Sequence, residues 1–179
     1  IYIAAEIKRP GAILQAGDIF RVVYGVRNSD EYRPALEDVA RDLEESGLTA
    51  LISDNIQRDA LQKFSYVSPM AACGAYYDID AGEMQKEGRV RDAFITLMRE
   101  IDTLAEAMGI HFSVDIVKTN LQILDNLSPK ASTSMQRDLK QGKDSEIDGL
   151  IFEVVRMGRQ YGVPVTTYAM IARSFGFKD

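Results

Sequence analysis

Lys63 is the residue whose type and neighbours are best suited to acid–base chemistry. It precedes a long run without any charged side chain, FSYVSPMAACGAYY. On a helix, Lys63 shares one side with Val67 and Met70, because residues three or four apart are neighbours. A lysine beside such an apolar surface loses hydration, which makes its ammonium group a better proton donor. The alternative is a lysine that extends to solvent from the end of a buried helix.

Two polar stretches further along the chain contain the other candidate site residues. Hydroxyl groups at residues 132–134 precede a short predicted helix, where a serine such as Ser134 and the first N–H groups can bind a carboxylate or a phosphate. Glu146 begins another predicted helix, near the positive end of its dipole. Each has a purely structural alternative, because hydroxyl residues cap helices and acidic residues favour their first turns.

The elements that must position these residues are of two kinds. Before Asp54 we expect three short strands and one helix that ends at Gly47. After Asp54 only helical patterns remain, and the first of these segments, apolar or small all round, should be buried on every side and bent at Pro69. The predicted strands are 1–7, 19–26 and 48–53, and the predicted helices are 31–46 with Ser29 as its cap, 55–77, 82–108, 114–127, a short helix near Thr133, 145–161 with Ser145 and Asp148 as a capping pair, and 164–175.

Composition argues against several classes of function. The chain has 179 residues, with 21 Lys+Arg against 27 Asp+Glu and a net charge of −6, which argues against nucleic-acid binding through a basic surface. No apolar run approaches the length of a membrane span. One cysteine, Cys73, and one histidine leave no disulfide framework and no Cys/His metal site, and they favour a reducing cytoplasm.

Four segments, in this order along the chain, resemble the ketopantoate reductase (2-dehydropantoate 2-reductase) family. They are LQKF at 61–64, STSMQRD at 132–138, EIDGLI at 146–151, and a closing GRQYGVPVT segment at 158–166. The resemblance implies a mainly α fold: an all-helical C-terminal domain of the 6-phosphogluconate-dehydrogenase-like type at 55–179, which binds substrate. It also implies that residues 1–54 are an incomplete α/β segment, the end of an NADP-binding Rossmann-like domain.

The same resemblance implies a role for each candidate site residue. Members of the family reduce a 2-oxo acid with NADPH in a cleft between their two domains. Lys63 matches the lysine that protonates the substrate's carbonyl oxygen, Ser134 matches the serine that holds its carboxylate, and Glu146 matches the acid that binds its hydroxyl and supports the lysine. We therefore expect a small 2-oxo acid as substrate, NADP(H) as cofactor, no metal, no nucleic acid and no membrane, with a homodimer as one compatible assembly.

Two positions depart from the family pattern. Val67 and Ala131 stand where family members usually have asparagine. Loss of two amide groups weakens recognition of a polyhydroxylated 2-oxo acid such as ketopantoate, which leaves open a D-2-hydroxyacid dehydrogenase for branched or aromatic 2-oxo acids. A catalytically inactive homologue and a non-catalytic helical dimerisation or interaction module also remain open.

The glycine-rich fingerprint of dinucleotide-binding domains is absent from this sequence. No GxGxxG motif follows a predicted strand, and Ile1 begins directly in a strand. Three strands and one helix are also too few to cover both faces of a sheet. We therefore expect a C-terminal fragment whose NADP(H) is bound mainly by a missing N-terminal domain, with the cofactor-binding residues unknown. Residues 1–179 alone should neither bind NADPH tightly nor turn over substrate.

Overall fold

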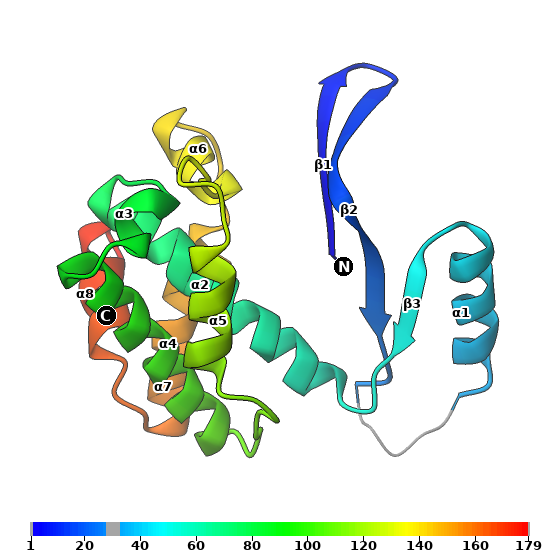
Figure 1. Ribbon diagram of the computed structural model, residues 1–179. Helices are drawn as coiled ribbons and strands as arrows, with labels where there is room; N and C mark the ends of the chain where they lie inside the picture. Colours follow the sequence, from blue (N-terminus) through cyan, green and yellow to red (C-terminus); the bar gives the residue numbers. More distant parts are fainter. Residues whose placement is uncertain (1, 28–32, 179) are drawn as a thin grey trace. The chain divides into compact units, whose positions relative to one another are not determined.

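A computed structural model describes residues 2–27 and 33–178 of the chain. The chain divides into two compact units, Ile1–Asp59 and Ala60–Asp179. The fold is mainly α, as predicted, and within the described residues all strands belong to the first unit (Figure 1). The predicted division of the chain at 54/55 into a cofactor-binding and a substrate-binding part stays a prediction.

The first unit is a three-stranded sheet with one helix (Figure 1). β1 (Tyr2–Arg9) and β2 (Ala12–Tyr24) form an antiparallel hairpin, and β3 (Thr49–Ile52) pairs in parallel with β2. α1 (Ala35–Glu45) connects β2 to β3 and contacts β3. The unit therefore contains one β–α–β crossover, with a hairpin strand added at its edge.

Two boundaries in this unit differ from the sequence prediction. β2 begins earlier than the predicted 19–26, because residues 12–15 pair with β1 across a turn at Gly11, where φ is 76°. α1 begins at Ala35 rather than at residue 31, and its predicted cap, Ser29, lies outside the described residues. Gly47, at φ 82°, follows the end of α1 as predicted.

The second unit is a bundle of helices that includes α2 (Ile56–Tyr77) from Ala60 onward. α2 begins where the Asn55 side chain accepts a hydrogen bond from the Arg58 N–H group at 2.9 Å. Every residue from Ser68 to Gly74 is buried, as predicted for a segment without a polar stripe, whereas Phe64, Tyr66, Val67 and residues 75–77 of the same segment are half-buried. The other helices are α3 (Ala81–Gln85), α4 (Arg89–Ala107), α5 (Ile116–Asp125), α6 (Ser134–Lys140), the π-helix η1 (Asp148–Phe152), α7 (Glu153–Tyr161) and α8 (Thr166–Ser174).

One segment predicted as a single helix is divided in the structure. The segment 82–108 contains α3 and α4, which are separated where Gly88 adopts φ 133°, a conformation that glycine tolerates and that interrupts a helix. The hydrophobic pattern continues through this break, so periodicity alone did not reveal it. The segment predicted at 145–161 is helical from residue 147 to residue 161, but it begins with the π-helical turn η1 before α7.

The core of the second unit lies between α2 and α4. The rings of Tyr66 on α2 and Phe94 on α4 meet edge to face, with 6.2 Å between their centroids. Side chains from α7 and α8 complete the same core. No described helix combines the length and the hydropathy that crossing a membrane requires.

Candidate functional site

Lys63 lies on α2 just before the buried middle of that helix. The residue is exposed, so the loss of hydration expected from the sequence is not found in the described chain. Leu61 and Phe64 pack against the core of the helical unit, and Ser65 is buried. Since successive helical residues turn by about 100°, Lys63 lies on the side of α2 turned away from those three residues.

Ser68 is the polar centre of the buried part of α2. Its hydroxyl oxygen lies 2.6 Å from the carbonyl oxygen of Leu150 on η1 and 2.6 Å from Oη of Tyr168 on α8. A carbonyl oxygen only accepts, so Ser68 donates to Leu150 and accepts from Tyr168. Ser68 and Tyr168 are both completely buried, and each hydroxyl has a partner there. These bonds join α2 to η1 and to α8.

A buried carboxylate on α4 holds the beginning of α8. Glu100, 8% exposed, accepts hydrogen bonds from the N–H groups of Thr167 at 2.7 Å and Tyr168 at 3.0 Å. The first N–H groups of a helix have no partner within it, so Glu100 caps α8 from a neighbouring helix. Burial raises the pKa of the Tyr168 phenol well above its ordinary value, which keeps its hydroxyl group protonated and able to donate.

Glu146 is exposed and lies two residues before the start of η1. Its carbonyl oxygen accepts a hydrogen bond from the Leu150 N–H group at 2.9 Å. The capping pair predicted from Ser145 and Asp148 does not form, because the Asp148 carboxylate binds Arg156 instead. That hydrogen bond lowers the pKa of Asp148 below its ordinary value.

Ser134 is the first residue of α6 and is exposed. Thr133, not Ser134, is the cap, since its hydroxyl accepts a hydrogen bond from the Gln136 N–H group at 3.2 Å. The Gln136 side chain attaches α6 to the end of α2, where its Nε2 donates to the carbonyl oxygen of Ile79 at 2.8 Å. Gly74 makes this close approach feasible, because a Cβ there would lie 2.6 Å from Gln136 Oε1.

The three predicted site residues are thus placed on or beside elements that α2 contacts. Lys63 and Gly74 are separated by about three turns, which puts them on nearly the same side of an ideal helix, about 16 Å apart along its axis. α6 contacts α2 at Gly74, through the Gln136 side chain. The joint role of Lys63, Ser134 and Glu146 remains a prediction.

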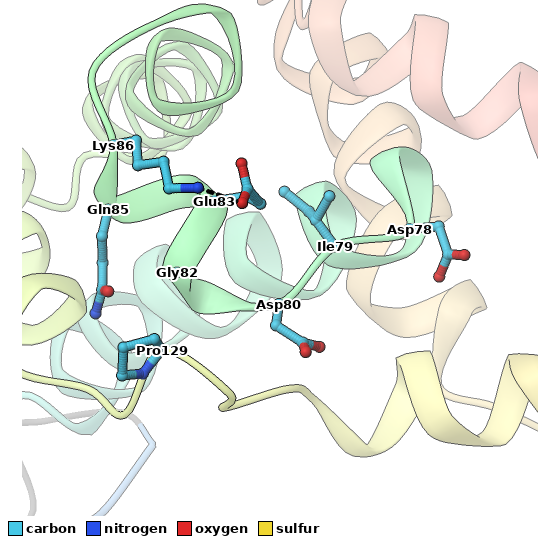
Figure 2. Close-up of a pocket in the computed structure, with 8 residues that line it drawn as sticks. All are labelled: Asp78, Ile79, Asp80, Gly82, Glu83, Gln85, Lys86 and Pro129. Atoms are coloured by element: carbon cyan, nitrogen blue, oxygen red, sulfur yellow. Dashed lines mark hydrogen bonds and ion pairs between the residues drawn. The ribbon is translucent and has the colours of Figure 1, made fainter.

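A pocket of about 650 Å³ lies at the far end of α2, beside α3 and Pro129 (Figure 2). It contains none of the three predicted site residues. The carboxylates of Asp78, Asp80 and Glu83 line it with a single lysine, Lys86, which is paired with Glu83. A net negative lining repels an anionic 2-oxo acid, so the pocket does not suit this substrate class. Within the described residues, no group of three metal-ligating side chains is found.

Comparison with models of known protein families identifies the family of this chain. The family model described as "Ketopantoate reductase PanE/ApbA C terminal" matches residues 55–179. The chain belongs to the ketopantoate reductase family. The resemblance that the sequence segments indicated is therefore confirmed.

Two curated relatives of the ketopantoate reductase family match this chain, and both are named 2-dehydropantoate 2-reductase. The protein from Aquifex aeolicus is 22% identical over 183 residues, covering 100% of this chain and 59% of the relative. The protein from Mesorhizobium japonicum is 28% identical over 176 residues, covering 93% of this chain and 50% of the relative. The chain therefore spans about half the length of the curated relatives it matches.

Several solved structures share the fold. The 2-dehydropantoate 2-reductase from Methylococcus capsulatus has a TM-score of 0.85 at 21% identity, covering 97% of this chain and 55% of that one. The dimeric ketopantoate reductase from Staphylococcus aureus has a TM-score of 0.83 at 17% identity, covering 97% and 58%. A D-mandelate dehydrogenase in complex with NADH has a TM-score of 0.79 at 23% identity, covering 96% and 58%.

Sequence reasoning missed the buried polar residues Glu100 and Tyr168. A signal for Glu100 was present, because it falls on the apolar stripe of α4 beside Leu97, Ile101 and Leu104. A charged residue on a core-facing stripe needs partners within the protein, since burial of an unpaired charge is costly. Tyr168 gave no comparable signal, because a buried tyrosine is common in helical cores.

Proposed function

We propose that this chain belongs to an enzyme that reduces a 2-oxo acid to a 2-hydroxy acid with NADPH, and that the substrate is ketopantoate, giving pantoate. The single observation that carries the proposal is the match of residues 55–179 to the ketopantoate reductase C-terminal family model. Residues 55–179 would form the substrate-binding domain. Two curated relatives named 2-dehydropantoate 2-reductase support this choice of reaction.

Each of the three candidate residues has a chemical role in this proposal. Reduction places negative charge on the substrate's carbonyl oxygen, and the Lys63 ammonium group would stabilise that charge and donate the proton. The Ser134 hydroxyl would donate a hydrogen bond to the substrate carboxylate. The Glu146 carboxylate would accept a hydrogen bond from a substrate hydroxyl and support the protonated form of Lys63.

The cofactor would be held mainly by residues outside this sequence. The chain contains no glycine-rich fingerprint for a dinucleotide pyrophosphate, so its own residues do not fit that group unaided. The first unit would be the end of the cofactor-binding domain. Large apolar side chains on its strands support this, because Ile7 is 78% exposed and Ile13 is 73% exposed, as expected of residues that a larger domain covers.

A second candidate function is a D-2-hydroxyacid dehydrogenase for branched or aromatic 2-oxo acids. Two observations favour it. Val67 and Ala131 stand where the family pattern has amide side chains, which would make the substrate site more apolar. The fold is also that of a D-mandelate dehydrogenase at TM-score 0.79.

We also propose that the protein forms a homodimer and is located in the cytoplasm.

The test uses the gene product that contains both this chain and a cofactor-binding domain. NADPH oxidation would be measured at 340 nm with ketopantoate and with branched and aromatic 2-oxo acids, and the ratio of kcat/KM values decides between the two candidates. Lys63→Ala should lower kcat by about 10²–10⁴-fold, the usual contribution of a general acid. Lys118→Ala removes an exposed lysine of α5 and serves as the matched control, with kcat unchanged.

Circular dichroism of both variants separates a loss of chemistry from a loss of folding. A Lys63→Ala protein that keeps the parent kcat would refute the assigned role of Lys63. Absence of turnover with every 2-oxo acid, in a folded protein that binds NADPH, would favour an inactive homologue or a helical interaction module instead.

A further inference from the structure

The buried hydroxyl pair Ser68–Tyr168 has no role in the proposed chemistry, yet it leads directly to Glu146. Tyr168 donates to Ser68, and Ser68 donates to the Leu150 carbonyl oxygen, each across 2.6 Å. The N–H group of the same residue, Leu150, donates to the Glu146 carbonyl oxygen at 2.9 Å. These hydrogen bonds connect a side chain on α8, through the Ser68 hydroxyl group and the main chain of Leu150, to the backbone of Glu146.

The turn that receives these bonds is π-helical rather than α-helical. In η1 the N–H group of Glu153 donates to the carbonyl oxygen of Asp148, five residues earlier. Such turns are rare and tend to occur as single turns at functional sites. Conversion of this turn to α-helix would change the register by one residue, and would rotate Glu146 by about 100° relative to α7.

The hydroxyl pair is well placed to prevent that conversion. Ser68 and Tyr168 are 0% exposed, so water does not compete for their hydrogen bonds. Glu100 holds the start of α8 through the Tyr168 N–H group, which fixes the helix that supplies the phenol. The Leu150 carbonyl oxygen, which lies in the π-helical turn, thus accepts from Ser68 of α2, and the Ser68 hydroxyl group is in turn held by Tyr168 of α8.

We propose that Ser68 and Tyr168 are positioning residues whose hydroxyl groups keep η1 π-helical and thereby fix where Glu146 presents its carboxylate. This inference rests on the proposed function, because it gives the pair a purpose through the substrate-binding role of Glu146. Neither hydroxyl contacts the substrate, and both act through the backbone that follows Glu146.

Two variants remove one hydroxyl group each, with little change in volume: Tyr168→Phe and Ser68→Ala. Both should lower kcat/KM for the 2-oxo acid by about ten- to hundredfold, the order expected when a reacting group is misplaced by about 1 Å. Both should also speed hydrogen exchange at the amides of residues 151–153. Tyr66→Phe is the matched control, because Tyr66 Oη is buried with no hydrogen-bond partner among the described residues. It should leave kcat/KM unchanged.

A double-variant cycle distinguishes positioning from a general loss of structure. If the pair acts through Glu146, adding Tyr168→Phe to Glu146→Gln should cause no further fall in kcat/KM. If the double variant instead shows the product of the two single losses in kcat/KM, the inference is overturned. Unchanged hydrogen exchange at residues 151–153 in Tyr168→Phe would also overturn it. If Glu146→Gln impairs turnover but Tyr168→Phe does not, the inference fails and the proposed function stands. If Glu146→Gln leaves turnover unchanged, the role of Glu146 and the inference fail together.

Discussion

Replacing Gly158 with alanine should destabilise the helical unit, although alanine is the better helix former. Gly158 is buried on α7, where a Cβ atom would lie 2.6 Å from Val165 Cγ2 and 2.9 Å from the carbonyl oxygen of Val163. Neither neighbour is free to withdraw. The Val163 N–H group donates to the Gly158 carbonyl oxygen at 2.8 Å, in the turn that ends α7 at Gly162, where φ is 67°.

The expected magnitude follows from two opposing effects. Alanine in place of glycine on a helix contributes about 1 kcal/mol of stability. Forcing an extra methyl group into a packed core costs about 1–3 kcal/mol, here against a backbone atom as well as a side chain. We expect the free energy of unfolding to fall by up to about 2 kcal/mol, and Tm to fall by up to about 6 °C.

Gly149→Ala is the matched control, because Gly149 lies in the adjoining η1 and a Cβ there would meet nothing within 4 Å. It should leave stability unchanged or raise it by up to about 1 kcal/mol. Urea unfolding followed by circular dichroism at 222 nm reports mainly on the helices. Relative to the parent, the urea midpoint of Gly158→Ala should be lower and that of Gly149→Ala should be equal or higher. A Gly158→Ala protein as stable as Gly149→Ala would refute the steric reasoning.

Two further predictions concern side chains with perturbed acidity. Burial raises the pKa of the Cys73 thiol to about 12, so iodoacetamide should label the folded protein far more slowly than the urea-unfolded protein, as measured by mass spectrometry; equal rates would contradict its burial. Arg91 donates two hydrogen bonds to the Asp125 carboxylate, at 2.7 and 2.9 Å, and holds its pKa below the ordinary value of 3.8. That contribution to stability is present above pH 3.8 and is lost as pH falls through the lower pKa of the folded state. Asp125→Asn should therefore be less stable than the parent in urea at pH 7, and the difference in stability between the two proteins should be smaller at pH 3. An equal difference at both pH values would show that the pair does not respond to acid.

The extent of α2 could be predicted from its composition. The uncharged stretch after Lys63 has no polar stripe, and a helix of that kind is stable only when other elements cover it on all sides. The structure shows Ser68 to Gly74 buried as expected. The same reasoning left open whether Lys63 faces an apolar surface or extends to solvent, because composition describes the helix as a whole and not the direction in which one side chain points; the structure shows Lys63 exposed.

The interruptions between helices could not be predicted, because they depend on local backbone conformation. Gly88 divides α3 from α4 at φ 133°, within a segment whose apolar pattern continues on both sides. η1 is π-helical where the sequence predicted an ordinary helix start. Its register is maintained by contacts with residues far away in the chain, and such contacts leave no periodic trace in the sequence.

The sequence by itself determined the family, the mainly α fold and the candidate residues Lys63, Ser134 and Glu146, because short segments and hydrophobic periodicity are local properties of the chain. Tertiary structure alone decided which polar groups are paired in the core. Ser68, Tyr168 and Glu100 come from three helices, and they meet because packing brings together residues far apart in sequence. A buried donor or acceptor must find its partner wherever the fold supplies one, and that partner is set by three-dimensional neighbours rather than by spacing along the chain.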